Sequence, residues 1–392
     1  MSKLAIECSI EQLQRRRSAK WRDFGPDVLP AWIAEMDFTA AEPVQRALQE
    51  LVDRQDYGYP RRDGARPDAY LARAFAERMG TAFDWDVDAQ HVVPMADLSQ
   101  AKAACLTAFS RSGEGVVTQT PCYPPFRDVV RDLARRFIAN PLRDGDARYE
   151  LDLDALAAIG NDARMLLLCN PHNPTGRAFT TDELQALGAL AVRHDWIVVS
   201  DEVHADLMYA ERPHRPLASL SAEIAARTVT ITSAAKSFNI PGLRCCVAHF
   251  GSKDLMERFV RAVPRRLLGQ PSIAGIDATV AAWRDGQPWL DQVRAQLAGG
   301  RRWLMQAVAS EPGLRMHEPE ATYFGWIDFG KRLPPGSAAA HLLREARVAF
   351  SPGEDFAADC AGFVRFNFAT SVAVREQIWA RVAAALNEQE TP

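Results

Sequence analysis

The stretch TSAAKSFNIPGLRCC, residues 232–246, places a lysine in an unusual local setting. Lys236 follows the run TVTIT (228–232) and three small residues, and Arg244 lies eight positions further on. TVTIT is rich in β-branched residues, which is typical of a buried strand. A solvated surface lysine needs no such surroundings. Lys236 is therefore a candidate for chemistry at the end of a strand.

Similar apolar runs surround this stretch and predict the fold class. They are GVVTQ (115–119), MLLLC (165–169), WIVVS (196–200) and RCCVAHF (244–250). Such continuous runs are expected of strands that are covered on both faces. Helical patterns separate them, as in residues 180–195, where Thr180 and Glu183 have capping-box spacing and three leucines share one face. We predict an α/β fold with a mostly parallel sheet flanked by helices.

The pattern changes near residue 286. A long helical region is followed by the strand-like ATYFGWIDFG, a second helical pattern, the strand-like FVRFNFA and a last helix. We predict a large domain over residues 50–285 and a smaller α+β C-terminal domain over 286–392. Residues 1–49 are expected to form an N-terminal arm and part of the small domain.

Composition excludes several classes of function. The net charge of −4 gives no reason to expect nucleic acid or an anionic membrane as partner. The N-terminal region lacks a signal-peptide pattern and no run is long enough to span a membrane, so we expect a cytoplasmic protein. Seven cysteines without a C-x-x-C pair argue against a disulfide framework and against a metal site.

Polar residues follow four of the predicted strands. They are Tyr123 in TPCYPPF, Asn173 in NPHNPTG, Asp201 and His204 in DEVHADL, and Lys236 in SAAKS. Ligands of open parallel sheets bind beyond the C-terminal ends of the strands, so these residues are expected to meet. Each also has a structural interpretation: a helix cap, a turn, a core histidine or core packing. Their common position favours a site.

These motifs resemble a known family. SAAKSFNIPGLR, NPHNPTG and DEVH are similar, in order, to the motifs of fold-type I enzymes that use pyridoxal 5′-phosphate (PLP), in the class I/II aminotransferase superfamily. LPAWIAEMDF, YGYP, TPCYPPF, DEVHADL and ATYFGWID resemble its cystathionine β-lyase (C–S lyase) branch of MalY/PatB type. The resemblance implies the PLP-dependent transferase fold and PLP as cofactor.

The resemblance also implies roles for individual residues around the cofactor ring. Lys236 would bind PLP covalently and move protons. Asp201 would hold the ring nitrogen protonated. Asn173 and His204 would lie near the ring oxygen, and Tyr123 would stack on the ring. Lys236, Asp201 and Tyr123 are the residues we expect to be catalytic.

The phosphate is expected at the start of a helix, where free N–H groups favour an anion. The implied ligands are Leu98, Ser99, Ser233, Arg244 and, from a neighbouring subunit, Tyr59, so the resemblance implies a homodimer. Asp97 departs from the Gly or Ser common in the family. Because a carboxylate near a phosphate is unfavourable, we expect Asp97 to cap the helix instead.

The resemblance also implies residues that bind the substrate. By resemblance, Arg365 in VRFNFA would bind the α-carboxylate of an amino acid, together with Asn173. Trp32, Met36 and Tyr323 are expected to line the substrate pocket.

The implied reaction is β-elimination from L-cystathionine or another cysteine S-conjugate, which yields a thiol, pyruvate and ammonia. The same groups would also serve an aminotransferase, or a specialised biosynthetic reaction such as decarboxylation-coupled oxidative deamination or cyclisation. A binding or regulatory protein without turnover is the alternative outside enzymes, and the intact set of lysine, aspartate and arginine argues against it.

Overall fold

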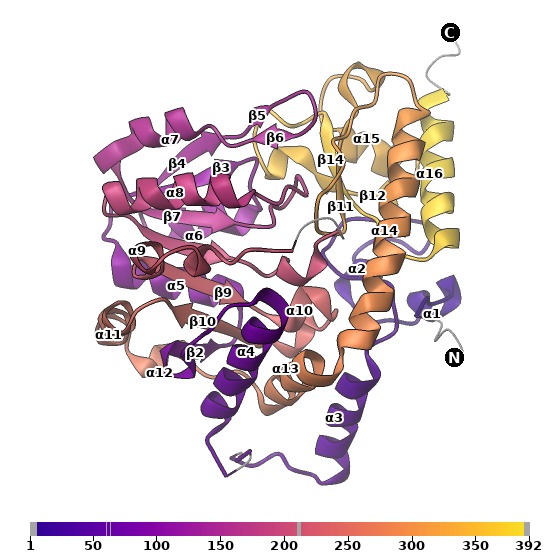
Figure 1. Cartoon of the computed structure of the whole chain (residues 1–392). Helices are drawn as coiled ribbons and strands as arrows, with labels where there is room; N and C mark the ends of the chain where they lie inside the picture. The colour runs from indigo at the N-terminus through magenta and orange to yellow at the C-terminus, as the bar shows by residue number, and fades with distance from the viewer. Residues whose placement is uncertain (1–5, 60, 63, 210–212, 388–392) are drawn as a thin grey trace.

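A computed structural model describes residues 6–59, 61–62, 64–209 and 213–387 (Figure 1). Its central feature is a seven-stranded sheet in the order β2-β10-β9-β8-β7-β3-β4. The strands are β2 (Val92–Met95), β3 (Gly115–Thr120), β4 (Arg136–Pro141), β7 (Ala163–Cys169), β8 (Ile197–Asp201), β9 (Thr228–Thr232) and β10 (Cys246–Phe250). Only β10 runs antiparallel to its neighbours. The mostly parallel sheet predicted from the apolar runs is confirmed.

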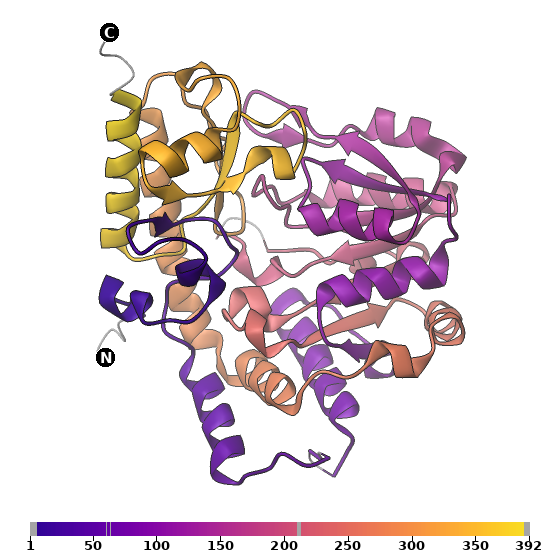
Figure 2. The ribbon, with the colours of Figure 1, turned by 180° about the vertical axis from the view of Figure 1, so that it is seen from behind.

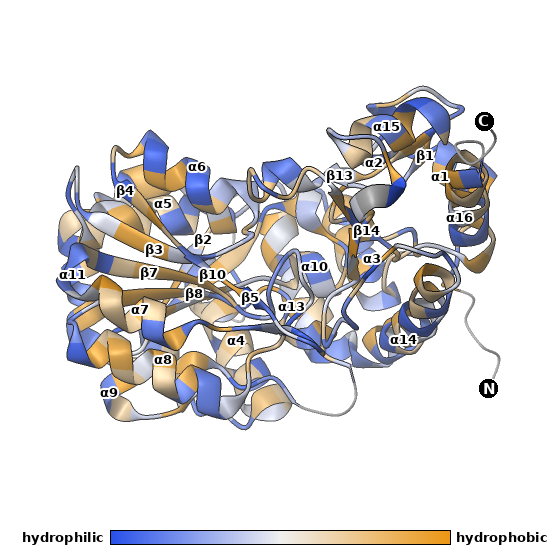
Figure 3. Cartoon of the chain, turned by 90° about the horizontal axis from the view of Figure 1, so that it is seen from above, coloured by the Kyte–Doolittle hydropathy of each residue, from blue (hydrophilic) through white to orange (hydrophobic). Residues whose placement is uncertain are grey.

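Helices cover both faces of the sheet, which explains why its strands are apolar throughout. On β7, Met165 and Leu167 pack with one cluster of buried residues, whereas Leu166 and Leu168 pack with another. The first cluster includes α5 (Leu98–Phe109), α6 (Pro124–Asp132) and α11 (Lys253–Ala262), and the second includes α7 (Leu153–Ile159), α8 (Thr181–Arg193) and α9 (Ala222–Ala225). Figure 1 shows the second group in front of the sheet, and Figure 2 shows α5 and α6 on the opposite face. Viewed from above, the strands are predominantly hydrophobic (Figure 3).

The sheet topology brings an end of every strand in this sheet to one edge. The parallel strands β2, β3, β4, β7, β8 and β9 all end there. Because β10 is antiparallel, its beginning lies at this same edge, as the pairing of Cys246 with Met95 shows. The segments that leave or enter the sheet at this edge include Asp97, Tyr123, Asn173, Lys236 and Arg244.

A smaller sheet lies beside the large one. Its order is β11-β14-β13, formed by β11 (Phe324–Asp328), β13 (Ser351–Pro352) and β14 (Phe363–Asn367). The helices α14 (Gln287–Ala309), α15 (Ala338–Glu345) and α16 (Val372–Asn387) accompany it (Figure 1). The N-terminal strand β1 (Leu29–Pro30) pairs with β12 (Val348–Ala349), so this segment packs with the C-terminal part of the chain.

Three further helices pack together. The helices α3 (Glu42–Asp53) and α4 (Pro67–Phe83) pack on α13 (Ile273–Asp285). All seven cysteines are free thiols, as the sequence predicts. Within the described residues, no helix has the length and apolarity to cross a membrane, and no group of side chains suits a metal ion.

Candidate active site

A cavity of about 280 Å³ lies at the edge where the strand ends meet. With one exception, every residue predicted to bind the cofactor lines it. These residues are Leu98, Ser99, Tyr123, Asn173, Asp201, His204, Ser233, Lys236 and Arg244. The exception is Tyr59, which is fully exposed and lines a different cavity of about 730 Å³. One chain therefore brings together the set that the strand ends predict.

Lys236 lies on the short helix α10 (Ala234–Ser237), directly after β9. Its Nζ donates a hydrogen bond to the carbonyl oxygen of Ala34 at 3.1 Å. Burial and, to a smaller extent, the Arg365 guanidinium lower the pKa of Lys236 to about 8, although Asp201 and Glu35 oppose the shift. An amine with this pKa is partly neutral near pH 8, as a nucleophile or general base must be.

Asp201 is the last residue of β8 and is buried. Its Oδ2 accepts a hydrogen bond from Lys102 Nζ at 2.8 Å, and its Oδ1 accepts one from the Val203 N–H at 3.3 Å. The carboxylate is therefore held at the wall of the cavity by two donors. Its main partner, Lys102, was not among the residues predicted from the sequence to lie in the site.

The helix α5 begins at the cavity wall with Leu98. Asp97 is its N-cap, because Asp97 Oδ1 accepts a hydrogen bond from the Gln100 N–H at 2.8 Å. The predicted cap is confirmed. The other oxygen of Asp97 forms an ion pair with Arg244, whose side chain is 64% exposed. Arg244, which is expected to bind the phosphate, is thus held beside the start of α5 by Asp97, the residue that replaces the Gly or Ser common in the family.

Ser233 is already engaged in hydrogen bonds next to this helix start. Its hydroxyl donates to the Cys245 carbonyl oxygen at 2.6 Å and accepts from the Ala235 N–H at 3.0 Å. To donate to an anion in the cavity, the hydroxyl would have to turn away from Cys245.

Arg365 is a buried cation on β14. Its guanidinium donates to Asn173 Oδ1 at 3.0 Å, to the Trp32 carbonyl at 2.8 Å and to Ser351 Oγ at 3.0 Å. Within the described part of the chain, no carboxylate pairs with it and its Nε has no partner. Burial lowers its pKa to about 10. A buried cation without a counter-charge is a site prepared for an anion.

Two further buried groups have unused hydrogen-bonding atoms. His204 Nδ1 and Tyr323 Oη have no partner among the described residues. Burial, with Lys236 and Arg365 nearby, lowers the pKa of His204 to about 3, so this ring is neutral. Burial also raises the pKa of Tyr323. Buried polar atoms normally have a hydrogen-bond partner, so these two unpaired atoms favour the binding of a polar ligand nearby.

Other predicted residues have different positions. Tyr123, 38% exposed, stands at the cavity mouth as the residue before α6. Trp32 is half-buried, and its carbonyl, not its ring, contacts Arg365. Trp32, Met36 and Tyr323, which were expected to line the substrate pocket, are not among the residues that line this cavity, and the side chains of Met36 and Tyr323 are fully buried in the hydrophobic core. A motif adjacent to the site does not show which way an apolar side chain points.

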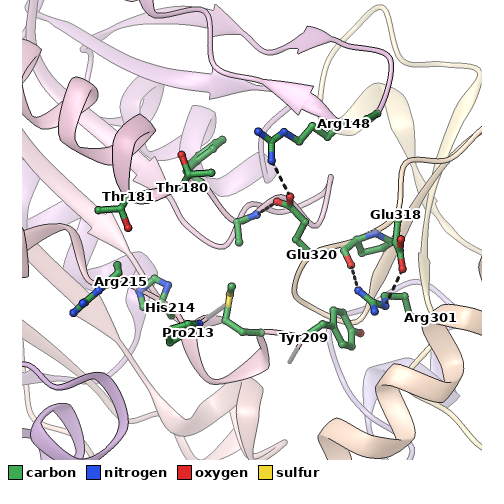
Figure 4. Close-up of a pocket in the computed structure, with 15 residues that line it drawn as sticks. Arg148, Thr180, Thr181, Tyr209, Pro213, His214, Arg215, Arg301, Glu318 and Glu320 are labelled. Carbon is green, nitrogen blue, oxygen red and sulfur yellow. Dashed lines mark hydrogen bonds and ion pairs between the residues drawn. The ribbon is translucent and has the colours of Figure 1, made fainter. Parts of the chain in front are cut away.

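A second cavity, of about 500 Å³, lies between the start of α8, residues 318–320 and Arg301 on α14 (Figure 4). None of the residues predicted to act in the site lines it. Glu320 is shared by Arg148 and Arg177, and Glu318 is paired with Arg301 at 3.4 Å. Both carboxylates of this cavity are therefore paired with arginines, whereas the first cavity contains the lysine predicted to act in the site.

Comparison with known proteins agrees with this geometry. The family model for aminotransferases of class I and II matches residues 34–382. Cystathionine β-lyase PatB of Bacillus subtilis is 32% identical over 380 residues, which cover 95% of this chain and 97% of PatB. Cystathionine β-lyase of Corynebacterium glutamicum is 30% identical, with 96% and 99% covered. The crystal structure of cystalysin from Treponema denticola, which contains PLP, has a TM-score of 0.91 at 25% identity over the whole of both chains.

Proposed function

Because this chain belongs to the class I and II aminotransferase family, we propose that it catalyses PLP-dependent β-elimination from L-cystathionine or another cysteine S-conjugate. The reaction converts R–S–CH₂–CH(NH₃⁺)–COO⁻ and water into R–SH, pyruvate and ammonium. One observation carries the proposal. A lysine with a lowered pKa, a buried carboxylate and a helix start beside an arginine meet in one cavity.

The residues of the cavity fit PLP. The orphaned atom of His204 and the first N–H groups of α5 can serve its polar substituents. Asn173 Oδ1 is used by Arg365, so the amide NH₂ group remains to donate to the ring oxygen. Asp201 provides the carboxylate for the ring nitrogen.

PLP, when bound, supplies an electron-withdrawing ring that stabilises negative charge at the substrate Cα. Lys236 removes the proton from this carbon, and its pKa of about 8 places the amine close to the working range of a general base. Arg365 binds the substrate carboxylate and orients the Cα–H bond towards Lys236. The lyases among the relatives support elimination over amino-group transfer.

The test is an assay without any keto acid. The purified holoenzyme is incubated with L-cystathionine or S-alkyl cysteine, and pyruvate, ammonia and thiol are measured. Equal amounts of the three support the lyase. Conversion of the cofactor to its amine form without pyruvate would contradict it and support the aminotransferase.

Asp97→Asn is expected to strengthen cofactor binding. Asparagine keeps the cap of α5 but removes the charge that Arg244 now neutralises. Because exposed ion pairs contribute about 0.2–1 kcal/mol, the Kd for PLP should fall about 2- to 5-fold.

The control is Asp97→Ala, which removes charge and cap together and should lower the free energy of unfolding by about 1 kcal/mol. Fluorescence titration of the apoprotein gives both affinities. A Kd that is unchanged or higher in Asp97→Asn would contradict the role assigned to this charge.

We also propose that the enzyme is a homodimer in which Tyr59 completes the partner's site. Tyr59 lies outside the cavity of its own chain and is fully exposed, next to the exposed Val260. Apolar side chains exposed together favour a protein interface.

Mixing two defective variants tests this arrangement. Tyr59→Phe and Lys236→Ala are unfolded and refolded together in equal amounts. In a dimer with shared sites, half of the molecules are hybrids with one intact site, so about a quarter of wild-type activity returns. No gain over the separate variants would contradict a shared site.

A further inference from the structure

Lys102 is a buried lysine on a mostly apolar helix. The helix α5 has the sequence LSQAKAACLTAF, and the Lys102 side chain is 3% exposed. Its Nζ lies 2.8 Å from Asp201 Oδ2 and 4.5 Å from the centre of the Phe126 ring. Burying an ammonium group costs several kcal/mol unless a partner offsets it. Lys102 therefore depends on Asp201, and Lys102 itself lines the cavity.

The surroundings offer Lys102 no second anion. Cys105 and Cys169 have pKa values raised to about 12 by burial, and burial raises that of Cys246 well above its usual value, so these thiols are neutral. The other charged groups that line the cavity are Lys236, which is another cation, and the ion pair of Asp97 with Arg244. Within the described residues, Asp201 is the one carboxylate in contact with Lys102.

When PLP is bound, the Asp201 carboxylate would therefore interact with two positive groups, the Lys102 ammonium and the protonated ring nitrogen. Asp201 is expected to hold a proton on the ring nitrogen by its negative charge. Lys102 already neutralises that charge from the other side. A second positive charge beside a site disfavours its protonation, with effects of about 1–3 pKa units for close groups.

We propose that Lys102, acting through Asp201, weakens electron withdrawal at the ring nitrogen and thereby favours β-elimination over amino-group transfer. The inference rests on the proposed function. A fully protonated ring draws negative charge away from the substrate Cα, which promotes protonation of the cofactor carbon and hence transfer of the amino group. With weaker withdrawal, the charge stays near Cα, where it expels the group on the β-carbon.

Lys102→Met tests the proposal, since methionine fills a similar volume without charge. The first measurement is the ¹⁵N resonance of ring-labelled PLP in the resting holoenzyme, which requires no turnover. In Lys102→Met the resonance should move towards the protonated value, whereas Lys102→Arg, which keeps the charge, should resemble the wild type. The second is the ratio of pyruvate formed to cofactor converted to its amine form, which should fall about tenfold or more in Lys102→Met.

A matched control separates this role from stability. Lys20 and Asp37 form another fully buried pair at 2.8 Å, outside the cavity. Lys20→Met should lower the melting temperature comparably but leave the resonance and the product ratio unchanged. If Lys102→Met does not fold, Lys102→Gln, which retains a hydrogen-bond donor for Asp201, replaces it.

Two outcomes would overturn the inference. An unchanged ¹⁵N resonance would show that Lys102 does not act on the ring nitrogen. A shifted resonance with an unchanged product ratio would show that it does not control the reaction. Failure of the proposed function is a different result, because the wild type itself would then form no pyruvate.

Discussion

Lys236→Ala is expected to lower kcat/KM for β-elimination by at least about 10³-fold and to abolish covalent attachment of PLP. The substitution removes the amine that binds the cofactor and the general base for the Cα proton, and a general base alone contributes about 10²–10⁴-fold. Borohydride reduction followed by mass spectrometry measures the attachment. The matched control is Lys253→Ala, which removes a lysine that is 77% exposed, and it should leave both readouts unchanged.

The pH dependence of the free energy of unfolding tests whether the Lys236 amine is buried and has a lowered pKa. In the apoprotein, burial lowers the pKa of Lys236 from 10.5 to about 8, so the unfolded chain binds more protons between these values. This lysine therefore destabilises the fold below about pH 8, and the penalty disappears as the pH rises towards 10.5. Lys236→Met should be more stable than wild type at pH 7, by about 3 kcal/mol, and nearly equal to it near pH 10.5. Equal stability at both pH values would contradict the buried position of the amine.

Local sequence signals predicted the parts of this fold that depend on neighbours along the chain. The capping box of Thr180 and Glu183 and the cap at Asp97 are both present, because each involves residues three positions apart. The apolar runs of β3, β7, β8 and β9 were found because burial on both faces requires apolar residues throughout.

The edge strands were missed for the opposite reason. β2 contains Pro94, and β4, RFIANP, has exposed residues at both ends and in its middle, and its one fully buried residue is the polar Asn140. Edge strands are only partly covered, so they lack the continuous apolar pattern. The reversed direction of β10 was also not predicted, since hydropathy contains no information about direction.

Lys102 shows what sequence alone could not provide for the site. A lysine in a helix is usually solvated, and its burial here depends on which face of α5 packs against the sheet. Its partner Asp201 is 99 residues away. The pairing of Asp97 with Arg244, 147 residues apart, is of the same kind. The positions of residues after the strands predicted which groups meet in the cavity. Which charged groups pair with one another could be seen only in the structure.

Arg365→Met is expected to lower kcat/KM for a cysteine S-conjugate by about 30- to 5,000-fold. The guanidinium lies over the rings of Phe324 and Phe356, at 4.3 and 5.0 Å from their centres, and is held by three acceptors. A substrate carboxylate would be its first anionic partner. Removing one member of a buried charge pair costs about 2–5 kcal/mol, which corresponds to this fall. Lysine lacks the planar fork, so Arg365→Lys should recover only part of the activity.

The decisive comparison uses a substrate without the carboxylate. The corresponding S-conjugate of cysteamine has hydrogen in place of this group, so wild-type enzyme already lacks the interaction with it. Arg365→Met should therefore reduce turnover of the cysteine conjugate strongly and that of the cysteamine conjugate only slightly. If Arg365 merely supports Asn173 and the Trp32 carbonyl, both substrates will lose activity by the same factor. Because the two ratios are measured on the same protein preparation, a general loss of folded enzyme cancels, and the difference reports the contact between Arg365 and the carboxylate alone.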